Sequence, residues 1–171
     1  YGYYTHHRFA FNDNEKYAYN NLNFSANWRT VFAEKLTGNF SFGYDHYDYR
    51  NDETVEEASA ARLSFAINQW FGKADFLYQA GNSHAVNFGL MSQLYNVNSG
   101  TYEPVGPNSL VRYDELQKDK ALESAVYIGD EWDITSRLSI NAGIRYSMLN
   151  ALGPRTYYTY QEGMLPSMSS V

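Results

Sequence analysis

The chain alternates between apolar and polar side chains with a period of two residues. From Leu22 to Phe32 the even-numbered positions are mostly apolar, and the odd positions between them are mostly Asn, Ser or Arg. Residues 138–148 repeat the pattern, with Leu, Ile, Ala, Tyr and Met alternating with Arg, Ser, Asn and Gly. Because successive side chains of a strand point to opposite faces, the pattern predicts strands with one apolar and one polar face.

Repeats of this pattern, separated by turn-forming residues, predict an antiparallel meander of about eight strands. The expected strands cover residues 1–11, 17–33, 38–50, 59–81, 84–97, 120–133, 137–150 and 155–162. Short turns are expected at 33–37, 81–83 and 134–136, and long polar connections at 51–57, at 98–120 and after 150. Short turns at one end and long loops at the other are typical of a transmembrane β-barrel.

The segment 59–81 changes the parity of its apolar positions. Leu63 and Phe65 are odd-numbered, whereas Trp70 is even-numbered. A bulge near Gln69–Gly72 would move the apolar side chains to the other face, and a tight hairpin there would have the same effect. We favour one long bulged strand, because it keeps every short turn at the same end of the sheet.

The composition is rich in aromatic residues but has no long apolar run. The 171 residues include 17 Tyr, 10 Phe and 3 Trp. No stretch approaches the ~18 consecutive apolar residues of a membrane helix, a finding that leaves alternating barrel strands open. The absence of cysteine excludes disulfides and thiolate metal sites. The net charge of −6 argues against a nucleic-acid surface.

A soluble β-sandwich would alternate in the same way, so the surroundings of the apolar face need a separate argument. The polar positions hold Asn, Ser, Gly, Gln and Arg, which suits an enclosed, wetted lumen better than an open surface. Trp28, Trp70 and Trp132 are expected to anchor at the membrane boundary, where amphipathic rings lie at headgroup level. We therefore favour a membrane barrel, closed by further strands so that no backbone edge meets lipid.

Several segments resemble, in the same order, the barrel of TonB-dependent receptors. The run Tyr127-Ile-Gly-Asp-Glu-Trp132 followed by Leu138-Ser-Ile-Asn-Ala-Gly-Ile-Arg-Tyr146 is similar to one of their hairpins. Lys73-Ala-Asp-Phe-Leu-Tyr78 and His84-Ala-Val-Asn-Phe-Gly89 resemble the preceding hairpin. Leu152-Gly-Pro-Arg155 resembles the next outer loop of receptors that carry an N-terminal carboxypeptidase-regulatory-like domain.

The resemblance implies an all-β segment of a barrel of about 22 strands with a plugged lumen. Residues 1–171 would then be an incomplete part of that domain, without the plug domain and the terminal strands. The implied function is uptake of a scarce solute across the bacterial outer membrane. The implied partners are outer-membrane lipid, the TonB–ExbB–ExbD system acting through the missing N-terminal plug, and a surface lipoprotein.

Two other hypotheses stay open. A porin-like or structural outer-membrane barrel needs only about eight strands, although the segment 59–81 is longer than one bilayer crossing requires. A soluble all-β module could instead bind glycans through surface tyrosines. We expect no enzymatic activity and no cofactor, because the chain has no phosphate-binding loop and no hydrolase or metalloprotease motif.

No metal site or catalytic pair is expected among the polar residues. His6 and His7 are adjacent, so they point to opposite faces of a strand and cannot chelate one ion together. The pairs Asp52–Glu53 and Glu56–Glu57 lie in a charged connection. We interpret them as a solvated loop rather than as paired catalytic carboxylates.

The remaining candidates are contacts to a solute or to a plug. Arg29, Arg137 and Arg145 fall on polar faces, and we favour pairing with carboxylates across strands over contact with a plug or an anionic solute. Loops on a rigid scaffold commonly carry recognition. Contacts to the solute are therefore most expected from three side chains of the 98–120 connection: Tyr102, Arg112 and Tyr113.

Overall fold

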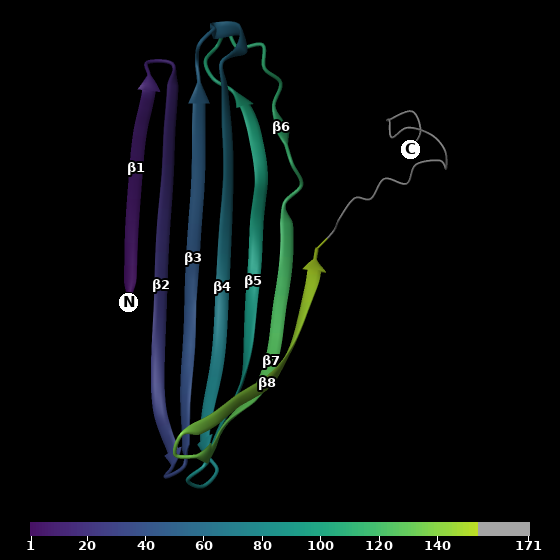
Figure 1. The fold of residues 1–171 in the computed structure, drawn as a ribbon. Helices are drawn as coiled ribbons and strands as arrows, with labels where there is room; N and C mark the ends of the chain where they lie inside the picture. The colour runs from purple at the N-terminus through teal and green to yellow at the C-terminus, as the bar shows by residue number, and fades with distance from the viewer. Residues whose placement is uncertain (154–171) are drawn as a thin grey trace, which may run out of the picture.

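The computed structural model describes residues 1–153, which form one antiparallel sheet (Figure 1). Its strands are β1 (Gly2–Asn12), β2 (Glu15–Ala33), β3 (Leu36–Glu53), β4 (Ala61–Gln79), β5 (His84–Pro104), β6 (Asp114–Glu115), β7 (Asp119–Thr135) and β8 (Leu138–Leu152), with a short 3-10 helix, η1, at Glu57–Ser59. The long strands follow one another in the order β1-β2-β3-β4-β5-β7-β8, and β6 pairs with β5. The predicted all-β meander is confirmed.

The connections differ between the two ends of the sheet (Figure 1). Short turns at residues 34–35, 80–83 and 136–137 join the strands at the lower end in the figure, which we call the turn end. Longer connections at 54–60 and 105–118 lie at the opposite end, the loop end. The predicted separation of short and long connections is confirmed, although the tight turn between β1 and β2 also lies at the loop end.

The two longer connections pack against each other. The Leu110 amide donates to the Ala58 carbonyl at 2.9 Å, and the Val105 amide donates to the Ala60 carbonyl at 3.0 Å. The Ser109 hydroxyl donates to the same Ala60 carbonyl at 2.7 Å. Backbone hydrogen bonds therefore hold these connections together above the strands.

The strands reach further toward the loop end than the sequence predicts. Residues 98–104 belong to β5, and Asp114–Glu115 form β6 against it, so the predicted 98–120 loop is partly wrong. Pro104 ends β5, because proline has no N–H with which to extend the pairing. The strand predicted at 155–162 lies outside the described residues.

The segment around β4 is one long strand, as predicted, but the bulge predicted near Gln69–Gly72 is wrong. The pairing of β3 with β4 runs without a shift in register along both strands. The irregularity lies nearer the loop end, where Ser64 faces Thr101 but Ala66 faces Asn98. The extra residue is therefore in β5, and the parity change within β4 needs another explanation.

A constant register over most of each strand divides the sheet into two faces. Even-numbered residues pair with even-numbered residues from β1 to β8, except beyond the irregularity in β5 and at the hairpin-end pairs Asn12–Glu15, Ala33–Leu36 and Thr135–Leu138. Paired residues of antiparallel strands point to the same side of a sheet. We call the two sides the even face and the odd face.

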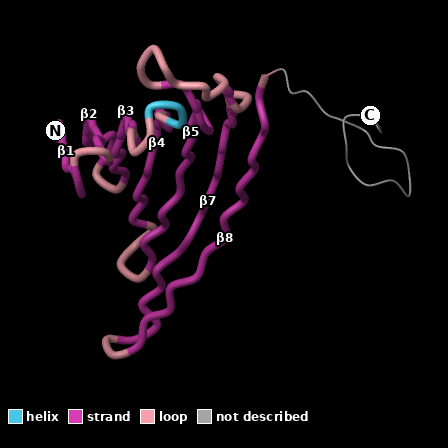
Figure 2. The backbone as a smooth tube through the Cα atoms, turned by 90° about the horizontal axis from the view of Figure 1, so that it is seen from above, coloured by secondary structure: helices cyan, strands magenta, loops and turns pink. Residues whose placement is uncertain are grey.

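Residues 1–153 form a single layer without a dry core (Figure 2). The buried hydrophobic residues described are Ala60, Ala61 and Ala125, and no large described side chain is fully buried. A sandwich would bury one face between two sheets, and no such burial is seen over these residues. The strands β1 and β8 are the two edges of the described sheet and do not pair with each other, so they do not close a small barrel. Among residues 1–153, no helix is long and apolar enough to span a membrane.

Candidate functional site

The even face is apolar along much of each strand toward the turn end. On β2 this stretch runs from Leu22 to Phe32, where Phe24 is 53% and Trp28 is 64% exposed. Ten residues rise about 33 Å along a strand. A strand tilted by about 45° then covers about 23 Å along the membrane normal, close to the apolar height of an outer-membrane barrel. We call this stretch of the even face the apolar band.

A hydrogen-bonded belt of polar side chains ends the apolar band on β2, β3 and β4. The Tyr44 hydroxyl donates to the Asn68 side-chain oxygen at 2.7 Å, and the His46 ring lies at the same distance from that oxygen. His46 also lies 3.2 Å from the Asp48 carboxylate, which accepts a hydrogen bond from Asn20 at 2.8 Å. Each of these groups has a partner, as polar groups at the edge of an apolar region require.

Beyond this belt the even face is charged. Arg62 binds the Asp52 carboxylate through two nitrogens at 2.6 and 3.0 Å, and it contacts Glu103 at 3.2 Å. The even face thus changes from apolar to charged along a single strand. This reversal explains why Trp70 is even-numbered and Leu63 is odd-numbered: the apolar side chains change faces while the backbone continues regularly.

The odd face shows the opposite order. Toward the turn end it carries amides and hydroxyls, including Asn27, which donates to the Ser41 hydroxyl at 2.9 Å, and Asn23, which donates to Asp45. Toward the loop end it carries aromatic rings. Each face therefore has an apolar half and a polar half. The apolar half lies toward the turn end on the even face and toward the loop end on the odd face.

Four side chains of the polar half, Lys73, Asp75, Tyr127 and Arg145, form what we call the charge cluster. The Lys73 ammonium lies 2.9 Å from the Asp75 carboxylate, which also accepts a hydrogen bond from the Tyr127 hydroxyl. The Arg145 guanidinium lies over the Tyr127 ring, 5.6 Å from its centre, and donates to Ser147 at 3.1 Å. Two cations and one carboxylate thus surround one phenol.

Gly89 makes the charge cluster possible. The register aligns Asp75, Gly89, Tyr127 and Arg145 in one row across β4, β5, β7 and β8. A Cβ atom at Gly89 would lie 2.5 Å from the Tyr127 hydroxyl and 2.5 Å from the Ala74 carbonyl oxygen. Because glycine leaves this space open, Tyr127 crosses β5 and reaches Asp75.

The aromatic half of the odd face is a continuous surface over β1 to β4. We call it the aromatic surface, and it comprises Phe9, Phe11, Tyr17, Tyr49 and Phe65. Phe9 stacks on Tyr17 with ring centres 4.9 Å apart, and Tyr49 stacks on Phe65 at the same distance. Tyr17 and Tyr49 lie 6.4 Å apart and join the two pairs. Burial among these rings, with Tyr17 beside it, raises the pKa of Tyr49.

The three arginines that the sequence predicted on polar faces lie in three different surroundings. Arg145 joins the charge cluster, Arg29 lies on the odd face of β2 opposite Asn39, and Arg137 lies in the turn between β7 and β8. None of the three forms an ion pair within residues 1–153, so the predicted pairing with carboxylates is not observed there.

The predicted loop contacts do not form one site within the described residues. Tyr102 lies opposite Leu63 near the end of β5, and Tyr113 donates a hydrogen bond to Glu115 at 2.7 Å. Arg112 is exposed in the connection between β5 and β6. No hydrogen bond or ring contact described over residues 1–153 joins Tyr102, Arg112 and Tyr113. Their contact with a solute stays a prediction.

All three tryptophans lie on the even face. Trp70 packs against Tyr44 and Phe42 beside the polar belt, and Trp132 stacks on His84 near the turn end. Trp28 stacks on Phe40 between these levels. That these indoles meet the membrane boundary stays a prediction.

The adjacent histidines lie on opposite faces, as predicted. His6 contacts Asn20, whereas His7 stacks on Tyr19 at 4.9 Å. In the described part of the chain, no three His, Asp or Glu side chains are grouped so that they could hold a metal ion.

Sequence reasoning missed the aromatic surface and most of the charge cluster. The odd-numbered apolar residues from Leu63 to Ile67 could have shown the first, had the parity change been interpreted as a reversal of faces. The sequence signal for the second was the pair Lys73 and Asp75, two residues apart on one strand and therefore on the same face.

A single-layer antiparallel meander with an exposed apolar band is the wall of a transmembrane β-barrel. The sequence profile of the TonB-dependent receptor-like β-barrel family matches residues 1–166. The chain therefore belongs to the TonB-dependent receptor β-barrel family. No curated protein matches the chain.

Family membership places the chain in the outer membrane, so the two faces of its wall have different surroundings. TonB-dependent receptor barrels lie in the outer membrane, act in transport, are not enzymes and work with the TonB system. The apolar band is the part of the wall that fits lipid, because a charged or amide-rich strip cannot face hydrocarbon without a large cost. We therefore expect the odd face to line the lumen, with the charge cluster at membrane depth and the aromatic surface nearer the loop end.

Proposed function

We propose that this chain is part of the barrel of a receptor that takes up a scarce solute across the outer membrane, with energy supplied through TonB. In this proposal residues 1–171 are one section of a barrel of about 22 strands, and a plug domain in its lumen couples transport to the TonB–ExbB–ExbD system. The observation that carries the proposal is the match to the receptor family together with a lumen wall that is polar and aromatic. A surface lipoprotein is a further proposed partner.

The positions of the aromatic surface and the charge cluster along the wall suggest which of them the solute meets first. The aromatic surface lies toward the loop end, so a solute arriving from outside meets it first. Aromatic rings offer large contact areas at a low cost in conformational entropy. The charge cluster and the amide-rich half of the wall lie further in, where a plug or a passing solute would meet hydrogen-bonding groups.

The test compares three strains of the source bacterium: one with the full-length receptor gene, one with the gene deleted, and one without TonB. Each grows in a complex medium, and mass spectrometry measures which solutes disappear from the medium. We expect one class of solute to be depleted only by the strain with both the receptor and TonB. Depletion that continues without TonB would contradict energised uptake, and identical spent media from all three strains would contradict transport of a solute from that medium.

A porin-like function is the second candidate, and the exposed apolar band fits it equally well. A porin would admit many small solutes without energy. The strain without TonB therefore separates the two functions directly.

A further inference from the structure

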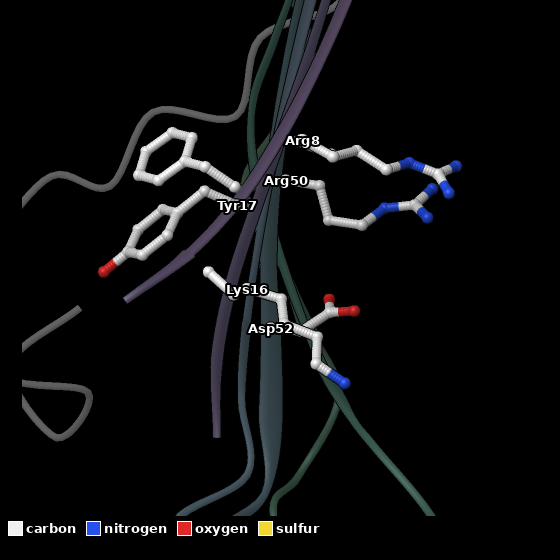
Figure 3. Close-up of a pocket in the computed structure, with 8 residues that line it drawn as sticks. Arg8, Lys16, Tyr17, Arg50 and Asp52 are labelled. Carbon is white, nitrogen blue, oxygen red and sulfur yellow. The ribbon is translucent and has the colours of Figure 1, made fainter. Parts of the chain in front are cut away.

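The lipid-facing side of the wall carries a pair of arginines beyond the apolar band. Arg8 on β1 and Arg50 on β3 both lie opposite Ala18 of β2 in the register. Two strand spacings put their Cα atoms about 10 Å apart. Figure 3 shows both side chains extended in the same direction, away from Tyr17, with Lys16 nearby.

A shallow hollow lies beside these cations. It has a volume of about 440 Å³, and Ala10 and Ala18 line it together with the odd-numbered Phe9 and Tyr17. Arg8, Arg50 and Lys16 at its rim are exposed, and none of the three forms an ion pair or a described side-chain hydrogen bond within residues 1–153. In the register only the small Ala18 side chain stands between the two arginines.

Carboxylates on the same face do not neutralise the hollow. Asp52 also lines it, but Arg62 holds that carboxylate through two nitrogens at 2.6 and 3.0 Å. Asp48 is held by Asn20 at 2.8 Å and by His46 at 3.2 Å. Three unpaired cations therefore remain at the hollow, and paired guanidinium groups bind phosphate oxygens with short, charge-assisted hydrogen bonds.

The height of the hollow matches the headgroup zone of the outer leaflet. Ala18 lies four residues beyond Leu22, the last large apolar even-numbered residue of β2, which is about 13 Å along the strand. A tilt of about 45° reduces this to about 9 Å along the membrane normal. Long arginine side chains at such a level reach toward lipid headgroups with their charged ends.

We propose that Arg8 and Arg50, assisted by Lys16, form a binding site on the outside of the barrel for the phosphate group of an outer-leaflet glycolipid. The proposal rests on the outer-membrane setting of the family and not on the proposed uptake of a solute. The bound lipid would fix this part of the wall to the leaflet that surrounds it.

The test measures lipid binding to the detergent-purified full-length receptor by native mass spectrometry. The probes are lipid A and lipid A from which the phosphates have been removed. We expect Arg8→Gln combined with Arg50→Gln to weaken lipid A binding at least about tenfold, equivalent to ~1.4 kcal/mol. Removal of the phosphates from the lipid should cause a similar loss in the unchanged receptor.

The matched control is Lys35→Gln combined with Arg137→Gln, which removes the same charge from turns at the turn end. This control should bind lipid A as the unchanged receptor does. Equal binding by the Arg8/Arg50 variant and the control would overturn the proposal, as would equal binding of the dephosphorylated lipid. Inorganic phosphate is the third probe, and if it displaced lipid A completely at millimolar concentration, the site would belong to free phosphate instead.

Two further measurements separate a loss of lipid binding from a loss of folding or of solute uptake. Heat-modifiable migration on gels shows whether each variant is folded, and we expect no change because Arg8 and Arg50 are exposed. Solute depletion from the medium is measured separately. Loss of lipid binding with unchanged depletion would support the lipid site alone.

Discussion

The Tyr127 ring occupies the space that a side chain at Gly89 would need. A Cβ atom at Gly89 would approach both the Tyr127 hydroxyl and the Ala74 carbonyl oxygen to 2.5 Å. The glycine on β5 and the tyrosine on β7 therefore act together, and the hydrogen bond from Tyr127 to Asp75 of β4 depends on them both.

Gly89→Ala is expected to destabilise the barrel by about 1–3 kcal/mol, because the new methyl group would force Tyr127 and the backbone apart. Urea unfolding of the full-length receptor in lipid measures the change. Gly72→Ala is the matched control, since nothing lies within 4 Å of a Cβ atom there. That control should be neutral or slightly stabilising, and equal losses for the two variants would show that the close contact at Gly89 is not important.

Phe42→Arg and Ser41→Arg test the assignment of the two faces. Phe42 is 50% exposed in the apolar band, whereas Ser41 lies on the odd face and accepts a hydrogen bond from Asn27. A charge at Phe42 should cost about 2–4 kcal/mol if the residue lies near the middle of the bilayer, and the change at Ser41 should be mild. Folding into lipid vesicles measures both, and equal tolerance would contradict the lipid-facing assignment.

The hydrogen bond between Tyr127 and Asp75 should appear as coupling in a double-mutant cycle. We expect Tyr127→Phe and Asp75→Asn to interact by about 1 kcal/mol in the free energy of unfolding, since partial exposure weakens a hydrogen bond to a charged group. Asp45→Asn replaces Asp75→Asn in the control cycle, because Asp45 is bonded to Asn23 instead. Additive effects in both cycles would mean that the charge cluster contributes no coupled stability.

The aromatic surface should be needed for binding of the solute but not for insertion into the membrane. Combining Tyr49→Ala with Phe65→Ala removes a stacked pair from the lumen wall, and we expect at least about a tenfold loss of uptake, equivalent to ~1.4 kcal/mol. Tyr146→Ala makes a similar truncation on the opposite face, where Tyr146 is 67% exposed. If both variants lost uptake equally, the effect would come from folding and not from recognition.

Glu115 should titrate at a lower pH than an ordinary glutamate. A hydrogen bond from the Tyr113 hydroxyl, followed by one from the Lys118 ammonium, lowers the pKa of the Glu115 carboxyl group. The contact is therefore present above the ordinary value of about 4.3 and is lost as the pH falls through the lowered pKa. Carboxyl chemical shifts measure the midpoint: Tyr113→Phe should raise it, and Tyr102→Phe should leave it unchanged. The prediction fails if Tyr113→Phe has no effect.

Local alternation was sufficient to predict most of the fold. The stretch from Leu22 to Phe32 repeats with a period of two, so its strand and its two faces could be predicted from side-chain geometry alone. The end of β5 could not be predicted, because residues 98–104 carry turn-forming types that pair only through contact with β4 and β6. Tertiary pairing overrides local preference at such positions.

The candidate site was less predictable, because its contacts cross several strands. Arg145 and Tyr127 are far apart in the chain from Lys73 and Asp75, and only the register brings them into one row with Asp75. The parity change in β4 was visible in the sequence, but a bulge and a reversal of faces produce the same local pattern. Only the unbroken pairing with β3 separates the two explanations.

Seven residues of β2, from Glu15 to Asn21, continue beyond Leu22, the last large apolar residue of its even face. This extension is about 23 Å long along the strand, and its neighbours pair with it throughout. In the proposed orientation, this paired backbone extends the barrel wall beyond the bilayer as a rigid rim. A solute that binds inside this rim would meet a preformed surface, so little ordering of the protein would oppose its capture.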